Sequence, residues 1–129
     1  MKNLKNRVIL SILLLVISGC VQEEHRKKVT FTVDTNAMDS VSEVGVRGQF
    51  TSPPWQVTVP MFDKDKDGIF EVTLSDKTAQ SSVEFKFVIE GDQYELECQP
   101  NRILKFKYQP EEIIYSGVFD QGDGEQKDL

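Results

Sequence analysis

The residues with the clearest potential for chemistry form an acidic run, Asp63-Lys64-Asp65-Lys66-Asp67-Gly68. Carboxylates at every second position followed by Gly match the start of a calcium-binding loop, in which oxygen ligands converge on one ion. The twelfth position of such a loop needs a bidentate Glu, but this chain has Leu74 there. Two interpretations stay open: a calcium site formed by Asp63, Asp65 and Asp67, or an Asp-rich hairpin turn between two strands, which we favour.

Histidine and cysteine are too scarce in this chain to build most catalytic or zinc sites. There is one His, His25, and there are two Cys, Cys20 and Cys98. A zinc site or a His-based triad needs more of these side chains than that. Carboxylates are plentiful, but no pair is marked as acid and nucleophile, and a small domain leaves little room for a deep cleft. We therefore predict a protein that is not an enzyme and needs no cofactor.

The N-terminus has the pattern of an export signal that ends at a lipid anchor. A basic head precedes an apolar run over residues 8–17, which is shorter than the ~20 residues needed to span a bilayer. The following Ile17-Ser18-Gly19-Cys20 resembles the bacterial lipobox, and that resemblance implies cleavage before Cys20 and lipidation of its sulfur. We expect a signal peptide over 1–19, a lipidated Cys with a polar tether over 20–28, and a location in the cell envelope, on either the periplasmic or the cell-surface face.

Composition limits both the size of the domain and its partners. Removing 1–19 leaves about 110 residues, enough for one small domain. Residues 1–19 hold three of the 15 basic residues and none of the 21 acidic ones, so the net charge falls from −6 to about −9. An acidic surface argues against nucleic acid and against an anionic membrane surface as partners, because both are bound through Lys and Arg. The expected contact with a membrane is therefore the lipid anchor. Residues 120–129 are polar and acidic, and we expect them to be a disordered tail.

The globular part, residues 29–119, shows the two-residue period of β-strands. Short runs rich in β-branched and aromatic residues alternate with polar residues and end at Gly, Pro, Asp or Asn. These runs cover residues 29–34, 44–47, 57–59, 70–74, 83–90, 94–97, 103–108 and 113–119. Because each run has one apolar face, two sheets must pack face to face, so the fold class is all-β. We predict an immunoglobulin-like antiparallel β-sandwich of about seven or eight strands.

Three segments of the second half resemble a known family. Val83-Glu84-Phe85-Lys86-Phe87-Val88, Tyr94-Glu95-Leu96-Glu97 and Pro100-Asn101-Arg102-Ile103-Leu104 are similar, in order and spacing, to the second half of family-20 carbohydrate-binding (starch-binding) modules. The first half fits more loosely, through its strands and a Trp that follows the strand ending in Gly48. The resemblance covers residues 29–119 and implies a starch- or α-glucan-binding domain that performs no catalysis.

The resemblance also implies which residues would contact sugar. The family site combines two aromatic stacking platforms with a Lys, a Glu and an Asn, and the matching positions are Trp55, Lys86, Glu97 and Asn101. The second platform is replaced by Leu96. Tyr94 lies two residues earlier, so strand alternation would put its ring on the same face as Leu96, where it could substitute for the missing ring.

Each of these residues also has a structural interpretation that stays open. Trp55 follows Pro53-Pro54 and could pack its own loop, Lys86 could be an ordinary solvated strand residue, and Asn101 could cap a turn. The alternative function is a structural or protein-interaction sandwich that has lost sugar binding, for which Leu96 is the best sign. Any protein partners are unknown from the sequence.

Overall fold

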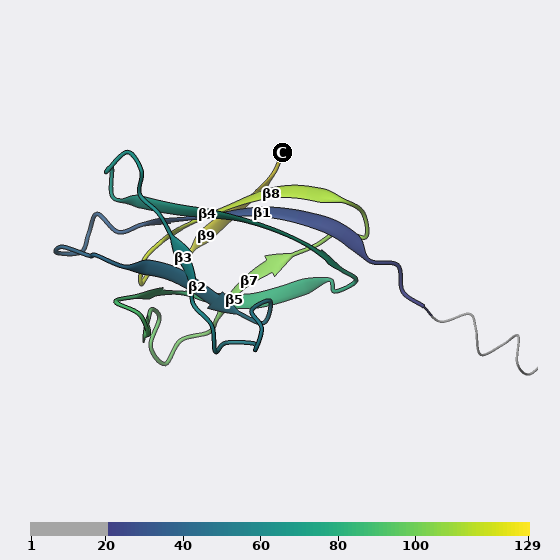
Figure 1. Cartoon of the computed structure of the whole chain (residues 1–129), viewed down its shortest axis with the longest axis horizontal. Helices are drawn as coiled ribbons and strands as arrows, with labels where there is room; N and C mark the ends of the chain where they lie inside the picture. Colours follow the sequence, from purple (N-terminus) through teal and green to yellow (C-terminus); the bar gives the residue numbers. More distant parts are fainter. Residues whose placement is uncertain (1–20) are drawn as a thin grey trace, which may run out of the picture.

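The computed structural model describes residues 21–129, and in that range the chain forms nine strands and no helix (Figure 1). The strands are β1 (His25–Asp34), β2 (Val44–Gly48), β3 (Val59–Met61), β4 (Ile69–Thr78), β5 (Ser82–Ile89), β6 (Gln93–Tyr94), β7 (Arg102–Lys105), β8 (Glu111–Val118) and β9 (Gly124–Asp128).

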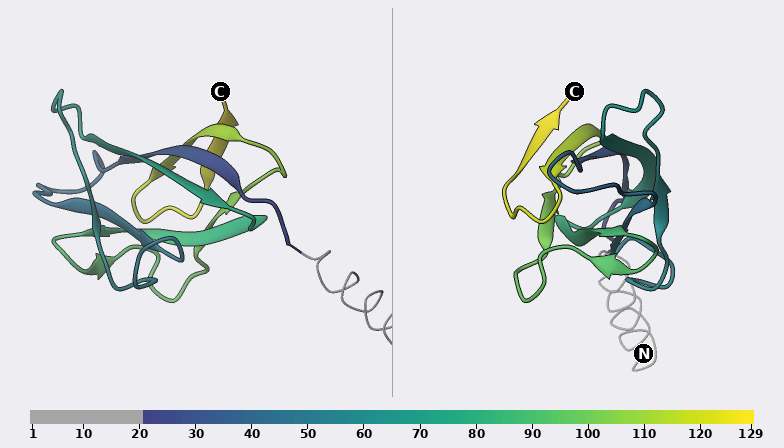
Figure 2. Two further views of the ribbon diagram at one scale, coloured as in Figure 1. Left: turned by 45° about the vertical axis from the view of Figure 1, so that its right-hand side comes forward. Right: turned by 90° about the vertical axis from the view of Figure 1, so that its left-hand side faces the viewer.

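The strands form two sheets packed face to face, so the predicted β-sandwich is confirmed (Figure 2). One sheet has the order β4-β1-β8-β9, and the other has the order β3-β2-β5-β6, with β7 also paired to β5. All neighbours are antiparallel except β1 and β8, which run parallel over 27–34 and 111–118. The structure thus differs from the expectation in one parallel pair and in strand number, since β6 has two residues and β9 was not foreseen.

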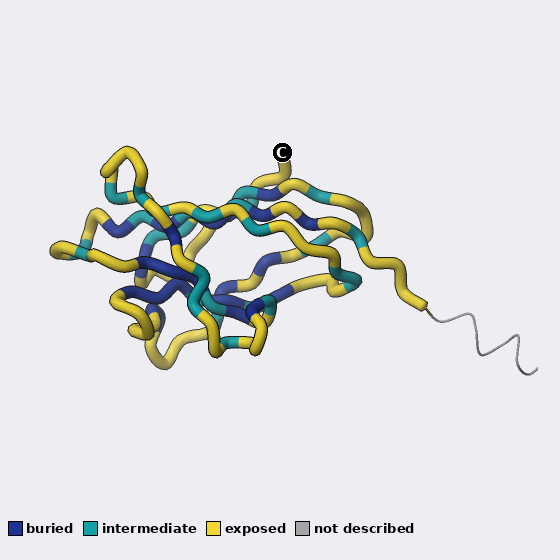
Figure 3. Tube along the Cα trace, in the orientation of Figure 1, coloured by how far each residue is buried: buried dark blue, intermediate teal, exposed yellow. Residues whose placement is uncertain are grey.

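The core consists of the inward-facing side chains of both sheets, which are the alternating apolar positions of the sequence. Figure 3 shows buried positions, in dark blue, along strands of both sheets. Phe85 is at the centre of the core, with ring centroids 5.0 Å from Phe31, 5.6 Å from Phe87 and 4.9 Å from Tyr115. The pairs meet edge to face, the arrangement that aromatic quadrupoles prefer. The nine strands described over residues 21–129 thus share one core between the two sheets.

The expected tether is shorter than predicted, because β1 begins at His25 rather than after residue 28. Lys27 is buried at 4% exposure despite its charge. Its ammonium donates to the carbonyls of Lys107 (2.6 Å) and Gln109 (2.5 Å) and to the Glu111 carboxylate (2.6 Å). These partners replace the water that Lys27 loses, so a residue that looks like tether is part of the sandwich.

The expected disordered tail is also corrected, because residues 124–128 form strand β9 along the edge of β8. Its side chains are mostly exposed, so the strand carries no apolar alternation that the sequence could reveal. The Gln126 side chain bonds the backbone of Lys105 on β7 in both directions, at 3.0 and 2.6 Å. Lys107 donates to Asp128 at 2.6 Å, which raises the pKa of Lys107. The last strand therefore links the two sheets along one side.

Candidate functional site

Two aromatic rings meet on the outer face of the β3-β2-β5-β6 sheet. The ring centroids of Trp55 and Tyr94 lie 6.5 Å apart at an angle of 43°. The Tyr94 hydroxyl donates to the Trp55 carbonyl at 3.0 Å, so the two segments are also joined by a hydrogen bond. Trp55 is half-buried and Tyr94 is 37% exposed, so both rings remain partly open to solvent. The sequence placed both residues in the site, and the structure brings them together.

The loop that carries Trp55 is held by a buried hydroxyl. Thr51 is 7% exposed, and its Oγ1 accepts the N–H of Trp55 at 2.8 Å while lying 2.9 Å from the carbonyl of Gly48. The Trp55 N–H also lies 3.0 Å from that carbonyl. Trp55 itself has φ of 64°, a conformation that is uncommon for a residue with a side chain. Such a backbone persists only where its surroundings enforce it, so the position of the indole is determined by this loop.

Arg47 supports the second ring and was missed by sequence reasoning. Its guanidinium carbon lies 5.5 Å from the centroid of the Tyr94 ring, and its Nη1 donates to the Tyr94 hydroxyl at 3.3 Å. It also donates to Thr58 Oγ1 at 2.6 Å and to the carbonyl of Gly91 at 3.2 Å. The only signal in the sequence was its outward position on the strand that ends in Gly48. We call Trp55, Tyr94, Arg47 and Lys86 the aromatic patch.

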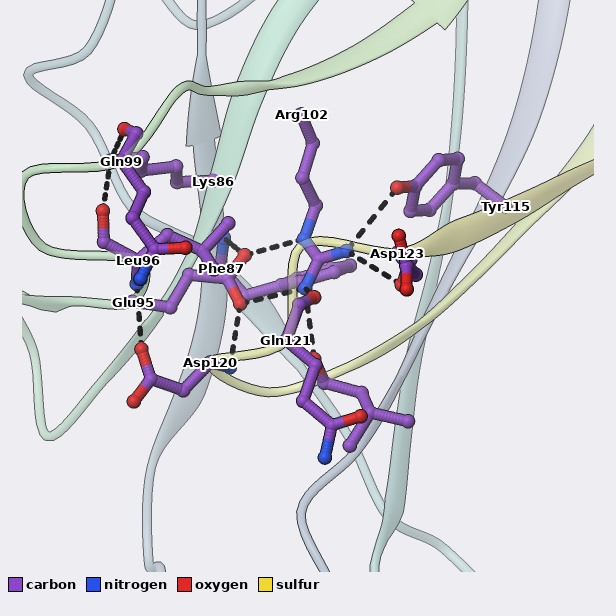
Figure 4. Close-up of polar contacts among 11 residues, drawn as sticks. Lys86, Phe87, Glu95, Leu96, Gln99, Arg102, Tyr115, Asp120, Gln121 and Asp123 are labelled. Atoms are coloured by element: carbon purple, nitrogen blue, oxygen red, sulfur yellow. Dashed lines mark hydrogen bonds and ion pairs between the residues drawn. The ribbon is translucent and has the colours of Figure 1, made fainter.

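Lys86 is directly opposite Arg47 in the β2–β5 pairing, so the two side chains leave the sheet on the same face. Its ammonium donates to the carbonyls of Leu96 (2.9 Å) and Gln99 (3.2 Å), as Figure 4 shows. Lys86 therefore holds the loop between β6 and β7 against the sheet. Of its three donors, one is free for another acceptor. The predicted position on the outer face is confirmed, and the side chain is anchored rather than simply solvated.

The predicted alternation over residues 94–97 is wrong. Strand β6 ends at Tyr94, and Leu96 has φ of 51° and is buried at 1% exposure. Tyr94 and Leu96 consequently do not share a face: Leu96 turns into the protein, and Tyr94 lies on the aromatic patch. Glu97 is exposed and Asn101 is half-buried, and within the described residues neither side chain makes a hydrogen bond. The structure thus does not show Asn101 capping its turn.

A buried ion pair lies beneath this loop and was not foreseen (Figure 4). The side chains of Glu95 and Arg102 are both 0% exposed, with bonds of 2.6 Å from Nε to Oε1 and 2.9 Å from Nη2 to Oε2. Glu95 also accepts the backbone N–H of Phe87 at 2.9 Å and that of Asp120 at 3.0 Å. A bidentate carboxylate with two more donors is fully satisfied, which makes its burial tolerable.

Arg102 joins both sheets to the segment that precedes β9. It donates to the carbonyls of Val118 (2.9 Å) and Gln121 (2.7 Å) and to the Tyr115 hydroxyl (3.3 Å). Burial acts to lower the pKa of Arg102, but the hydrogen bonds with Glu95 and Tyr115 outweigh it and raise the pKa. The motif Pro100-Asn101-Arg102 therefore contributes its Arg to the architecture that positions the loop.

The acidic loop, Asp63, Asp65 and Asp67, brings carboxylate oxygens within 4.8 Å of one another. Both Asp63 oxygens accept backbone N–H groups, from Asp67 at 3.1 Å and Gly68 at 2.9 Å. Desolvation acts to raise the pKa of Asp63, but these donors outweigh it and lower the pKa, whereas the neighbouring Asp67 and Asp63 carboxyls raise the pKa of Asp65. Leu74 pairs with Val29 inside the sheet and supplies no ligand. The loop has its own hydrogen bonds, but β3 and β4 belong to different sheets and the chain on either side of the loop is paired at the isolated Phe62–Glu71 bridge. The predicted hairpin turn is therefore wrong: the loop crosses from one sheet to the other.

Cys20, the predicted lipid-bearing residue, lies outside the described residues. The described chain begins at Val21, which is 91% exposed, and runs directly into β1. Cys98 is a free, exposed thiol in the loop after β6. Over residues 21–129 no helix has the length and apolar character needed to cross a membrane.

Comparison with protein-family models gives no match to this chain, and comparison with curated protein sequences gives no significant match. The described residues form a two-sheet β-sandwich that carries an aromatic patch on the outer face of one sheet.

Proposed function

We propose that this protein is a lipid-anchored component of a bacterial cell envelope whose sandwich binds an α-glucan chain at the aromatic patch without catalysing a reaction. The observation that carries the proposal is the pairing of Trp55 with Tyr94 at 6.5 Å, from segments 39 residues apart in sequence. Two adjacent, partly open rings are what successive glucose units of a chain require as platforms. The resemblance to starch-binding modules supports the same choice of ligand.

The chemistry of the patch suits a neutral, hydroxyl-rich ligand. One face of a glucose ring presents C–H groups, and a flat aromatic side chain recovers hydrophobic energy from that face. Stacking on one ring contributes about 1–3 kcal/mol, by analogy with bases stacked on aromatic side chains. Around the rings, Lys86 and Arg47 retain unused donors, and the exposed Glu97 carboxylate offers acceptors. Sugar hydroxyls can satisfy both kinds of group.

The first test is retention of the purified 21–129 domain on insoluble starch. We expect the native domain to be retained, and Trp55→Ala or Tyr94→Ala to weaken binding about 5- to 150-fold, the factor for losing one platform. Tyr108→Ala is the matched control, because Tyr108 is an exposed Tyr that meets His25 edge to face near the start of β1. Failure of the native domain to bind, or retention that survives Trp55→Ala, would contradict the proposal and favour a protein-interaction role.

The anchor is tested separately in a bacterial host. Mass spectrometry of the full chain is expected to show cleavage before Cys20 and a lipid-sized mass on that residue. Cys20→Ser should release the protein from the membrane fraction, whereas Cys98→Ser, the matched control at the other cysteine, should leave it bound. An unmodified Cys20 would refute the anchor and leave the sugar site untouched.

A further inference from the structure

Two cations of the aromatic patch, Arg47 and Lys86, have no carboxylate partner within residues 21–129. Among the Lys and Arg residues of this segment, only four are not exposed: Lys27 and Arg102 are buried, and Arg47 and Lys86 are half-buried. Lys27 and Arg102 each have a carboxylate oxygen 2.6 Å away, and the pair formed by Arg102 is drawn in Figure 4. The ion pairs of the described residues include neither Arg47 nor Lys86.

These two cations also face each other. Arg47 and Lys86 are Cα partners in the β2–β5 pairing, an arrangement of like charges that destabilises a sheet. Carboxylates are not scarce, because residues 21–129 hold all 21 acidic residues and all but three of the 15 basic ones, for a net charge of about −9. Glu84 leaves β5 on the same face, but its carboxylate contacts Gln49 at 3.5 Å. The aromatic patch therefore holds concentrated positive charge on an otherwise acidic domain.

Both cations keep hydrogen-bond donors for a ligand. The Arg47 guanidinium has five N–H groups and uses three, for Thr58, Tyr94 and the carbonyl of Gly91. The Lys86 ammonium has three and uses two, for backbone carbonyls of the loop after β6. Three N–H donors thus remain beside the aromatic rings. A sugar hydroxyl can accept from them, but a neutral hydroxyl does not offset two positive charges.

A phosphate monoester matches this arrangement in charge and in acceptors. It carries a charge of about −1.5 to −2 at pH 7 and three strong acceptor oxygens. Arg and Lys are both established ligands of phosphate groups in proteins. We infer that the α-glucan bound at the aromatic patch carries a phosphate monoester, with the phosphate between Arg47 and Lys86 and sugar rings on Trp55 and Tyr94. This inference rests on the proposed function and specifies the ligand of the same site.

The test is isothermal titration calorimetry of the purified protein with maltoheptaose and with maltoheptaose that carries one 6-phosphate. We expect the phosphorylated sugar to bind about tenfold tighter at low salt, the lower end of the effect of hydrogen bonds to a charged group. This preference should largely disappear in 1 M NaCl, where the Debye length is about 3 Å. Equal affinity for the two sugars at low salt would overturn the phosphate inference and leave the proposed function intact, whereas failure of both sugars to bind would contradict the proposed function itself.

Inorganic phosphate, added alone as a competitor, shows whether the sugar and the phosphate are recognised together. We expect it to displace the phosphorylated sugar only at much higher concentration than unmodified maltoheptaose does, because it makes no contact with the rings. Displacement by inorganic phosphate at equal or lower concentration would mean a general anion site and would overturn the inference.

Variants of Lys86 locate the phosphate. Lys86→Gln removes one charge and is expected to reduce the tenfold preference to about threefold or less, whereas Lys86→Arg should retain it. Lys105→Gln is the matched control, because Lys105 is an exposed cation on β7 of the same sheet. The ratio of the two affinities is the readout, so a general disturbance of the loop that Lys86 holds affects both sugars and cancels.

An undiminished preference in Lys86→Gln, or an equal loss in Lys105→Gln, would overturn the assignment of the phosphate to Arg47 and Lys86. Circular dichroism checks that each variant is folded. If Lys86→Gln does not fold, the salt dependence of the preference in the native protein still decides, because a preference that persists unchanged in 1 M NaCl would contradict binding by these charges.

Discussion

The buried pair of Glu95 and Arg102 makes a quantitative prediction about stability. Both side chains are 0% exposed, and Arg102 is the common donor to Glu95, Tyr115 and three carbonyls that precede β9. Arg102→Met removes all of these bonds and leaves the Glu95 charge buried. Glu95→Gln instead leaves the guanidinium without its counter-charge and turns an amide N–H₂ toward donors.

Breaking a buried pair by removing one partner costs about 3–5 kcal/mol. Each single variant should therefore lose about that much of the free energy of unfolding, which for a domain of this size is about 5–15 kcal/mol. The double variant contains no isolated charge, so we expect it to cost about as much as one single variant. The coupling energy is then about 3–5 kcal/mol, equal to the cost of one single variant and at or above the upper end of measured values for residues in contact.

The assay is urea unfolding of the 21–129 domain, followed by circular dichroism and by the fluorescence of Trp55, the one Trp in the chain. The control cycle is the pair of Lys28 and Glu112, which lies 3.3 Å apart but is about half exposed on both sides. That cycle should give a coupling of about 0–1 kcal/mol. The reasoning would be refuted if the free-energy costs of the Glu95 and Arg102 variants simply add in the double variant, or if their coupling energy is no larger than that of the control cycle.

Three further predictions concern the loops and the last strand. Asp65→Asn should raise the melting temperature at neutral pH, because the neighbouring carboxyls raise the pKa of Asp65 and its charge is therefore destabilising. This increase in melting temperature should vanish below the ordinary pKa of 3.8, and a decrease in melting temperature at neutral pH would instead indicate that the loop needs the charge to hold a cation. Glu90→Gln should lower the melting temperature at neutral pH, because hydrogen-bond donors from Ser42 and Glu43 lower the pKa of Glu90 and so stabilise the charged carboxylate. The difference in melting temperature between Glu90→Gln and the native domain should shrink as the pH falls below 4.5, and a difference that does not depend on pH would contradict this prediction. Gln126→Ala should cost about 1–3 kcal/mol in urea unfolding, for two lost hydrogen bonds, and no change would show that β9 does not link the sheets.

Most of the sandwich could be predicted from the sequence because its strands alternate strictly between apolar and polar residues. Val29, Phe31 and Val33 are all buried, as their spacing requires. The two ends could not be predicted in this way. Lys27 is buried only because two carbonyls of the β7–β8 connection and the Glu111 carboxylate at the start of β8 surround its ammonium, and β9 exposes most of its side chains. Neither arrangement leaves a two-residue apolar period.

Some residues of the candidate site could be predicted from the sequence, and others could not, because the chain departs from strand geometry in this region. The family resemblance named Trp55 and Lys86, and strand alternation named Tyr94. In the structure these residues lie on the outer face of one sheet, although Tyr94 and Leu96 do not share a face as the alternation required. The chain leaves strand geometry after Tyr94, with positive φ at Leu96, and Glu95 turns inward to a guanidinium seven residues later in sequence. Arg47 is one outward cation among many in the sequence, and only the fold shows that it supports the Tyr94 ring.

Binding of an α-glucan at the aromatic patch is tested most directly by nuclear magnetic resonance of the labelled 21–129 domain during titration with maltoheptaose. Because the chain has one Trp, Trp55 gives a single indole N–H signal that reports on the patch alone. We predict a saturable shift of that signal together with shifts in Arg47, Lys86 and Tyr94, while β9 stays unchanged. A saturated titration without a shift of the indole signal would contradict the proposed site.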